Sequence, residues 1–128
     1  MDNGEERQVI SGEILKQLEW IRENQFMVSK KAFAHALLSK PGKPSRNCYL
    51  TYHKWHESPH GLDKIRESTR KMLHDRISLL THISHSHNWT PNNEPLKMMK
   101  PGERNNLFVA TVNQYLMALA APPTLSAH

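Results

Sequence analysis

The chain has 128 residues, enough for one compact domain and too few for an enzyme with separate cofactor and substrate lobes. Hydrophobic residues make up 38% and charged residues 23%, a balance that excludes a wholly disordered chain and a membrane protein. The formal net charge is +5, and the single cysteine, Cys48, excludes a disulfide framework and a cysteine-based zinc motif. Because residues 1–7 also lack a signal-peptide apolar region, we expect a protein of the reducing cytoplasm without a membrane partner.

The apolar spacing predicts an all-α protein with five helical segments and no strand. Residues 1–10 read as an acidic, flexible N-terminus, and the first helix is expected at about 11–23. The second helix is predicted from about Lys30 to Leu38 behind a Ser29 N-cap. Residues 39–44 read Ser-Lys-Pro-Gly-Lys-Pro and are expected to form a turn, because each proline lacks an amide hydrogen.

The third segment, from a Ser45 cap to about His56, predicts a helix with two different faces. One face would pack on the core and carries Cys48, Tyr49, Tyr52 and Trp55. The opposite face carries groups that can donate hydrogen bonds to phosphates and base edges, on Arg46, Asn47, Thr51 and Lys54, together with Leu50. A capped helix, a turn and a second helix of this kind form the arrangement of a helix-turn-helix, although the six-residue turn is longer than usual.

The charge distribution favours a polyanion as partner. Between Asn24 and His56 the chain has no Asp or Glu, whereas its Lys and Arg residues cluster there. Each Lys or Arg that neutralises a DNA phosphate releases a condensed counterion, so such clusters suit a DNA-binding face; a merely solvated basic surface is the alternative. The residues expected to contact double-stranded DNA are Lys30, Lys31, Lys43, Ser45, Arg46, Asn47, Thr51 and Lys54.

The second half of the chain predicts two long helices separated by a linker. The fourth helix is expected from about Gly61 to Leu80, which would complete a helical DNA-binding domain at 11–80. Its inward face would carry Leu62, Ile65, Thr69, Met72, Leu73, Arg76 and Leu80. Residues 81–102 lose this periodicity and gather prolines and asparagines, which indicates an irregular linker or hinge.

The last helix, expected at 103–121 before a flexible tail at 122–128, is almost uncharged and needs a partner. It could fold back on the domain, but we expect it to join copies of the chain into a dimer or tetramer, which would bind repeated half-sites more tightly. The residues expected at this oligomer contact are Leu107, Val112, Tyr115, Leu116 and Leu119.

No enzymatic constellation is evident in the sequence, and we expect neither a catalytic residue nor a cofactor. Cys48 falls on the packing face, where an inert thiol is expected. The chain has nine histidines, and His82, His85 and His87 have a spacing that could chelate a metal. No cysteine or acid lies nearby to complete the set, so surface and capping histidines are expected, and metal binding by this cluster is left open.

The run Arg46-Asn47-Cys48-Tyr49-Leu50-Thr51-Tyr52-His53-Lys54-Trp55, followed by Asp63-Lys64-Ile65-Arg66 at the start of a long helix, resembles the YdaT-type prophage regulators. These are small proteins proposed to act like the phage lambda CII activator. The resemblance covers about residues 10–80 in outline. It implies a helical DNA-binding domain with a C-terminal oligomerisation helix, acting as a transcription regulator of a phage, prophage or other mobile element. It places Arg46, Asn47, Thr51 and Lys54 on the recognition helix.

Two other functions are compatible with the sequence. The chain could be a small inhibitor or adaptor that binds a host or phage protein, because Trp89, Met98 and Met99 lie in the predicted linker and such side chains often anchor protein contacts. Alternatively, Trp89 could pin the linker to the domain. A third reading is non-specific binding of RNA or single strands through Tyr49, Tyr52 and Trp55.

Overall fold

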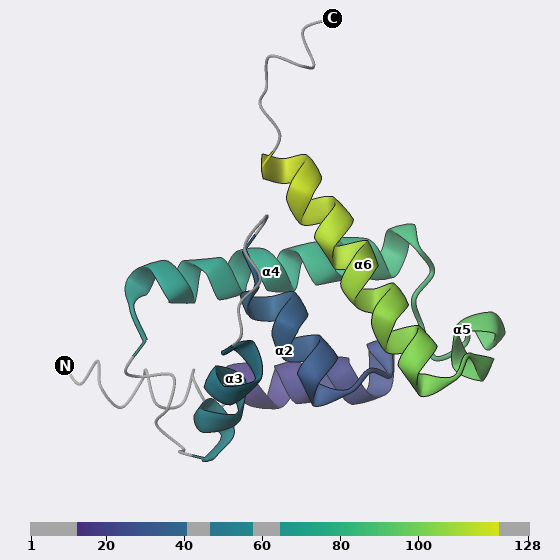
Figure 1. Ribbon diagram of the computed structural model, residues 1–128, viewed down its shortest axis with the longest axis horizontal. Helices are drawn as coiled ribbons and strands as arrows, with labels where there is room; N and C mark the ends of the chain where they lie inside the picture. The colour runs from purple at the N-terminus through teal and green to yellow at the C-terminus, as the bar shows by residue number, and fades with distance from the viewer. Residues whose placement is uncertain (1–12, 41–46, 58–64, 121–128) are drawn as a thin grey trace, which may run out of the picture.

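A computed structural model describes residues 13–40, 47–57 and 65–120, and these residues form helices without a strand, as predicted (Figure 1). After a helical segment at 13–20, the elements in chain order are the π-helix η1 (Ile21–Phe26) and the α-helices α2 (Lys30–Leu38), α3 (Cys48–Glu57), α4 (Glu67–Ser86), α5 (Glu94–Met98) and α6 (Pro101–Ala120). The fold class is all-α. Among the described helices, none has the length and apolar character needed to cross a membrane.

The first helix changes its winding at Ile21 and ends at a left-handed residue. Residues 13–20 are α-helical and continue directly into η1, whose C-cap Met27 has a φ of 57°. The Met27 amide donates to the Arg22 carbonyl oxygen at 2.8 Å, which closes the wider turn. Leu18 and Phe26 are fully buried. The predicted helix at 11–23 therefore reaches three residues further than expected, while residues 11 and 12 lie outside the described part.

Helix α2 is the centre of the fold and contacts α3, α4 and α6 (Figure 1). Ser29 is its N-cap, as predicted, because the Ser29 hydroxyl accepts a hydrogen bond from the Ala32 amide at 3.2 Å. The buried residues of α2 are Ala32, Phe33, Ala34, Ala36 and Leu37. The three alanines have small side chains, so several neighbouring helices can pack closely around α2.

A buried arginine on α4 caps the C-terminal end of α2. Arg76 is only 7% exposed, and its guanidinium group donates to the carbonyl oxygens of Ala36, Leu37 and Ser39 at 3.0, 3.0 and 2.7 Å. Burial lowers the pKa of Arg76, whereas nearby Cys48 and Asp75 act in the opposite direction. The last carbonyls of a helix have no partner within the helix, so Arg76 satisfies groups that would otherwise be buried alone.

The predicted linker at 81–102 is wrong, because most of this segment belongs to the folded body. Helix α4 extends to Ser86, α5 occupies Glu94–Met98, and α6 begins at Pro101. Trp89 is 1% exposed and its indole Nε1 donates to the Phe26 carbonyl oxygen at 2.9 Å. The prolines and asparagines therefore shape turns between packed elements, and their composition did not reveal that the indole enters the core.

Aromatic rings run through the core and join its two ends. The ring contacts connect Trp89 and Phe26 with Phe108, then Phe108 with Phe33, Phe33 with Tyr52, and Tyr52 with Trp55, at centroid separations of 4.9 to 6.3 Å. Buried aromatic pairs of this kind add about 0.5–1.5 kcal/mol each beyond the area that they bury. The core thus couples α3 at one end to the turn after α4 at the other.

Helix α6 packs against α2 of the same chain, so the predicted oligomerisation helix folds back on the domain. Val112 and Leu116 are 1% and 6% exposed and belong to the core, which corrects their assignment to an oligomer contact. Tyr115 is half-buried. Leu107 and Leu119 remain exposed, at 41% and 74%. The C-terminal end of α6 extends past α4 in Figure 1, which explains why its last turn is not covered by the described residues.

Candidate nucleic-acid interface

Helix α3 has the two faces that the sequence predicts, with one exception. Cys48, Tyr52 and Trp55 are 4%, 0% and 5% exposed and form the packing face. Tyr49 was expected beside them, but it is 40% exposed and stacks on His53 instead, with ring centroids 5.9 Å apart. The buried positions follow the narrow i, i+4, i+7 spacing, so a residue about 100° away from Cys48 points to solvent.

The outward edge of α3 carries the polar groups assigned to DNA. Asn47 and Lys54 are exposed and Thr51 is half-buried, and the spacing of these three residues places them on one side of the helix. The Asn47 carbonyl accepts the Thr51 amide at 2.9 Å, which ties Asn47 to the first turn of α3. Leu50, 55% exposed, lies among them. The predicted contacts Lys43, Ser45 and Arg46 lie outside the described residues.

A hydrogen-bonded network holds α3 in place on the side of its packing face. The Tyr52 hydroxyl donates to Glu19 Oε2 at 2.7 Å, and Arg22 donates to both Glu19 oxygens at 3.0 and 2.9 Å. Burial opposes ionisation of Glu19, but the hydrogen bonds from Arg22 and Tyr52 and the positive charge of Arg22 bring its pKa below the usual value. Burial and the Glu19 carboxylate raise the pKa of Tyr52 far above the usual range. The network therefore keeps an ionised Glu19 against a neutral Tyr52, which links the N-terminal helix to α3.

His56 completes the inner side of this network. Its Nε2 is buried, has no hydrogen-bond partner among the described residues, and lies 4.0 Å from Glu19 Oε2. Burial lowers the pKa of His56; Glu19 opposes this shift, and the charges of Lys30 and Arg22 reinforce it. The neutral imidazole is therefore favoured in the folded protein.

The two lysines at the start of α2 lie in different surroundings. Lys30 is exposed, and its charge acts on His56 of α3. Lys31 is also exposed but lines a pocket against α6. The structure therefore associates Lys30 with the α3 side of the molecule and separates Lys31 from it, although the sequence assigns both to one DNA-binding face.

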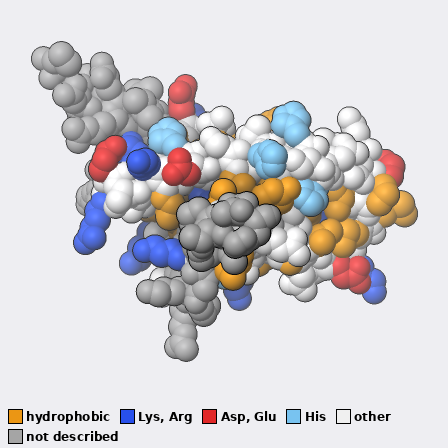
Figure 2. All heavy atoms as spheres, turned by 90° about the horizontal axis from the view of Figure 1, so that it is seen from above, with side chains coloured by type: hydrophobic (Ala, Val, Ile, Leu, Met, Phe, Trp, Pro, Cys, Tyr) orange, Lys and Arg blue, Asp and Glu red, His pale blue; other side chains and the backbone are white. Residues whose placement is uncertain are grey.

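The histidine cluster lies on the face that carries α4. Figure 2 looks onto this face and shows histidines spread along it, with Lys and Arg side chains mostly toward one end. His82 packs edge-on against the Tyr115 ring, and His87 Nε2 is 3.0 Å from the Tyr115 hydroxyl oxygen. Within the described part of the chain, no three His, Cys, Asp or Glu side chains are arranged to hold a metal ion. Two of these histidines instead help to hold α6 on α4.

The structure also reveals arginines whose roles the sequence did not indicate. Arg104 of α6 donates to the carbonyl oxygens of Met27, Leu96 and Met99 at 2.7, 3.2 and 2.9 Å. It ties α6 to the end of η1 and to α5. For Arg76 a signal was present, since a charged residue stood among apolar ones on the predicted inward face of α4, whereas nothing in the sequence marked Arg104.

Comparison with protein-family models, with curated proteins and with solved structures gave no match to this chain. The assignment of function therefore depends on the chemistry of the described surfaces.

Proposed function

We propose that the protein binds double-stranded DNA through the outward edge of α3 and acts in the cytoplasm as a transcription regulator of a phage, prophage or other mobile element. The observation that carries the proposal is that the core holds α3 in place with this polar edge facing outward. Asn47, Thr51 and Lys54 lie on one side of a helix whose other side is anchored by fully buried Tyr52 and by nearly buried Trp55. The likeness of this run to YdaT-type regulators supplies the biological role.

The chemistry of the edge suits a duplex. An asparagine amide can pair with adenine through two hydrogen bonds, a threonine can contact either base edges or phosphate, and a lysine can neutralise a phosphate. No Asp or Glu occurs between Asn24 and His56 to repel the phosphates from within this segment. The described carboxylates nearest in sequence are already engaged, since Glu57 pairs with His53 at 2.9 Å and Glu23 pairs with Arg22 at 2.9 Å.

Binding of single strands by base stacking has weaker support from the structure than from the sequence pattern. Of the three aromatic residues that would form a stacking platform, Tyr52 and Trp55 are buried in the core, and Tyr49 alone is exposed among them. Base stacking needs accessible ring faces on successive bases. A duplex reader is therefore preferred to a single-strand binder.

The proposal is tested by fluorescence anisotropy with labelled duplex DNA over a range of salt concentrations. For the wild-type protein, the logarithm of the association constant should fall steeply with that of the salt concentration, and Lys54→Ala should reduce this slope by about 0.9. On a duplex selected from a randomised pool, Asn47→Ala should cost about 1–3 kcal/mol. Lys97→Ala, which removes an exposed lysine from α5, is the matched control. Absence of duplex binding at low salt, or equal slopes for the two lysine variants, would contradict the proposal.

We also propose that the active species is a homo-oligomer joined by the end of α6. The carrying observation is the exposed last turn, where Leu119 is 74% and Met117 is 53% exposed. Sedimentation analysis of the sample used for DNA binding measures the mass of the species, and a monomer that binds DNA with full affinity would refute this part.

One observation favours a second function, that of an inhibitor or adaptor. Met98 is 80% exposed on α5, and flexible methionines at a surface are common contacts for other proteins. Trp89 no longer supports this function, because its indole is buried and anchors the turn after α4. Stoichiometric recovery of a protein from cell extract, lost in Met98→Ser, would favour the adaptor over the regulator.

A further inference from the structure

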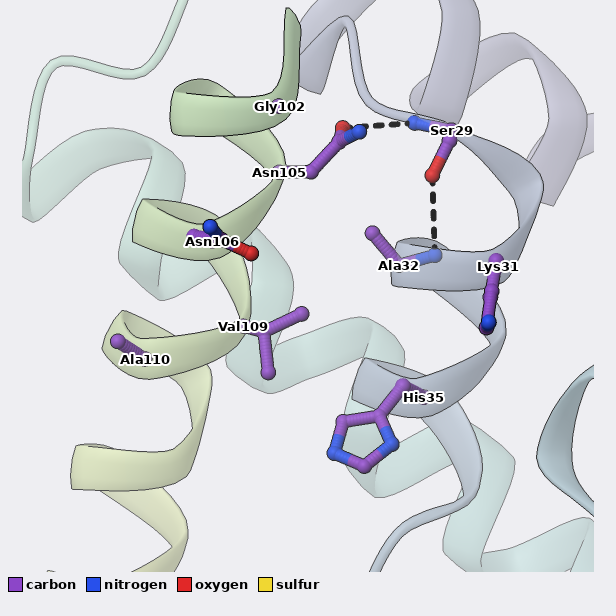
Figure 3. A pocket seen from close by; sticks show the side chains of 9 residues that line it. All are labelled: Ser29, Lys31, Ala32, His35, Gly102, Asn105, Asn106, Val109 and Ala110. Atoms are coloured by element: carbon purple, nitrogen blue, oxygen red, sulfur yellow. Dashed lines mark hydrogen bonds between the residues drawn. The ribbon is translucent and has the colours of Figure 1, made fainter. Parts of the chain in front are cut away.

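A pocket of about 530 Å³ lies between α2 and the N-terminal half of α6 (Figure 3). Its volume falls within the range of sites that hold small molecules. The pocket does not involve the outward edge of α3, so its occupancy can be examined independently of DNA binding.

One part of the lining offers cationic and amide groups. Lys31 and His35 come from α2, and Asn105 and Asn106 come from α6. Asn105 Oδ1 accepts a hydrogen bond from the Ser29 amide at 3.0 Å, so this oxygen is engaged and the Nδ2 amino group is the part of the side chain left to donate. Among the described residues, no Asp or Glu lines the pocket. A ligand group that accepts hydrogen bonds and carries negative charge is therefore preferred.

The other part of the lining is apolar. Ala32 and Val109 contribute methyl groups to the pocket, and Ala110 also belongs to its lining. Figure 3 shows His35 reaching from α2 toward α6, with Asn106 and Val109 reaching from α6 toward α2, so polar and apolar groups share the same space. A mixed lining of this kind holds a compact apolar body by burial and orients it through a few polar contacts. A bare inorganic anion would leave the methyl groups without a partner.

We propose that the α2–α6 pocket binds a small organic anion, in which a carboxylate or phosphate group is attached to a short apolar or aromatic body. Lys31 supplies the positive charge at the rim, the Asn105 and Asn106 amides donate to the anionic group, and Ala32 and Val109 contact the body. This gives Lys31 a role separate from the DNA contact that the sequence suggested. It also places a ligand between the two helices whose packing holds α6 on the domain.

The binding test is an NMR titration of the full-length protein with benzoate and, separately, with phenyl phosphate. At least one of them should bind with a Kd on the order of 1 mM, as expected for probes of this size, and shift the methyl signals of Ala32 and Val109. The response distinguishes a carboxylate site from a phosphate site. Benzyl alcohol and inorganic phosphate, which provide the body or the charge alone, should bind more weakly. Absence of these shifts with both anions, or equal binding of benzyl alcohol, would overturn the proposal.

Two variants locate the binding. Lys31→Gln should weaken binding of the preferred anion about tenfold, as expected for loss of a charged hydrogen-bond partner. Gly102→Leu adds a side chain at a lining position and should therefore narrow the pocket. It should leave the fold undisturbed, because a Cβ at Gly102 would meet no atom of the described residues within 4 Å. Lys97→Gln, at an exposed lysine of α5, controls for net charge and should bind as wild type. Unchanged affinity in Gly102→Leu, or equal affinity in the two lysine variants, would refute the site.

Discussion

Replacement of Arg76 by alanine should be among the most destabilising single changes in this protein. The guanidinium group donates to three carbonyl oxygens at the end of α2, at 2.7–3.0 Å, from a position only 7% exposed. Each carbonyl left without a partner in a buried place costs at least about 1 kcal/mol. Loss of the positive charge beside a helix C-terminus adds up to about 2 kcal/mol in a buried geometry. We therefore expect Arg76→Ala to lower the free energy of unfolding by about 3–5 kcal/mol, a large part of the total for a domain of this size.

The measurement is urea denaturation followed by circular dichroism and by the fluorescence of the tryptophans. Lys71→Ala removes an exposed cation from the same helix and should change stability by less than about 0.5 kcal/mol. Arg76→Lys keeps the charge but lacks the planar fork that reaches several carbonyls, so it should recover only part of the loss. A loss below about 1 kcal/mol in Arg76→Ala would refute the reasoning, because the three carbonyls would then have found other partners.

Two further changes test the core and the polar network. Trp89→Ala should lower the free energy of unfolding by about 3–5 kcal/mol in chemical denaturation, because a buried indole and its hydrogen bond to the Phe26 carbonyl are lost. Met98→Ala, at an exposed site, is the control and should stay near wild type. Similar small losses of stability in both variants would restore the linker interpretation. The folded pKa of His56 lies below its ordinary value of 6.5, so the unfolded chain takes up more protons as pH falls below about 7, and stability is lost on acidification. His56→Phe should flatten this loss in denaturation midpoints measured between about pH 7 and pH 5, and an unchanged slope would contradict the assignment.

Local patterns in the chain were sufficient to predict α2 and the packing face of α3. The Ser29 hydroxyl was a recognisable cap because its position just before an apolar stretch leaves it free to accept an amide of the first turn. The packing residues Cys48, Tyr52 and Trp55 were likewise visible, since their spacing brings them to one side of a helix. Of the candidate DNA contacts, Asn47 and Lys54 are exposed as expected.

The segment after residue 80 shows where local patterns failed. Its turn-forming composition is compatible both with a solvated linker and with short turns that pack against the core. Only the burial of Trp89 distinguishes between these two arrangements. The same holds for Val112 and Leu116, since an apolar helix face needs a partner but does not specify whether that partner is α2 of the same chain or a second copy.

The sequence by itself determined that the chain is helical, where α2 and α3 lie, and that α3 has an apolar packing face opposite a polar outward edge. These features could be predicted because caps, prolines and side-chain spacing act over only a few residues. Tertiary structure alone decided that Arg76 caps α2, that Tyr52 meets Glu19, that α6 folds back, and that Lys31 faces a pocket. These contacts join residues distant along the chain, and whether they form depends on which helix faces meet, since a hydrogen bond or a buried ring stabilises only where both partners are brought together.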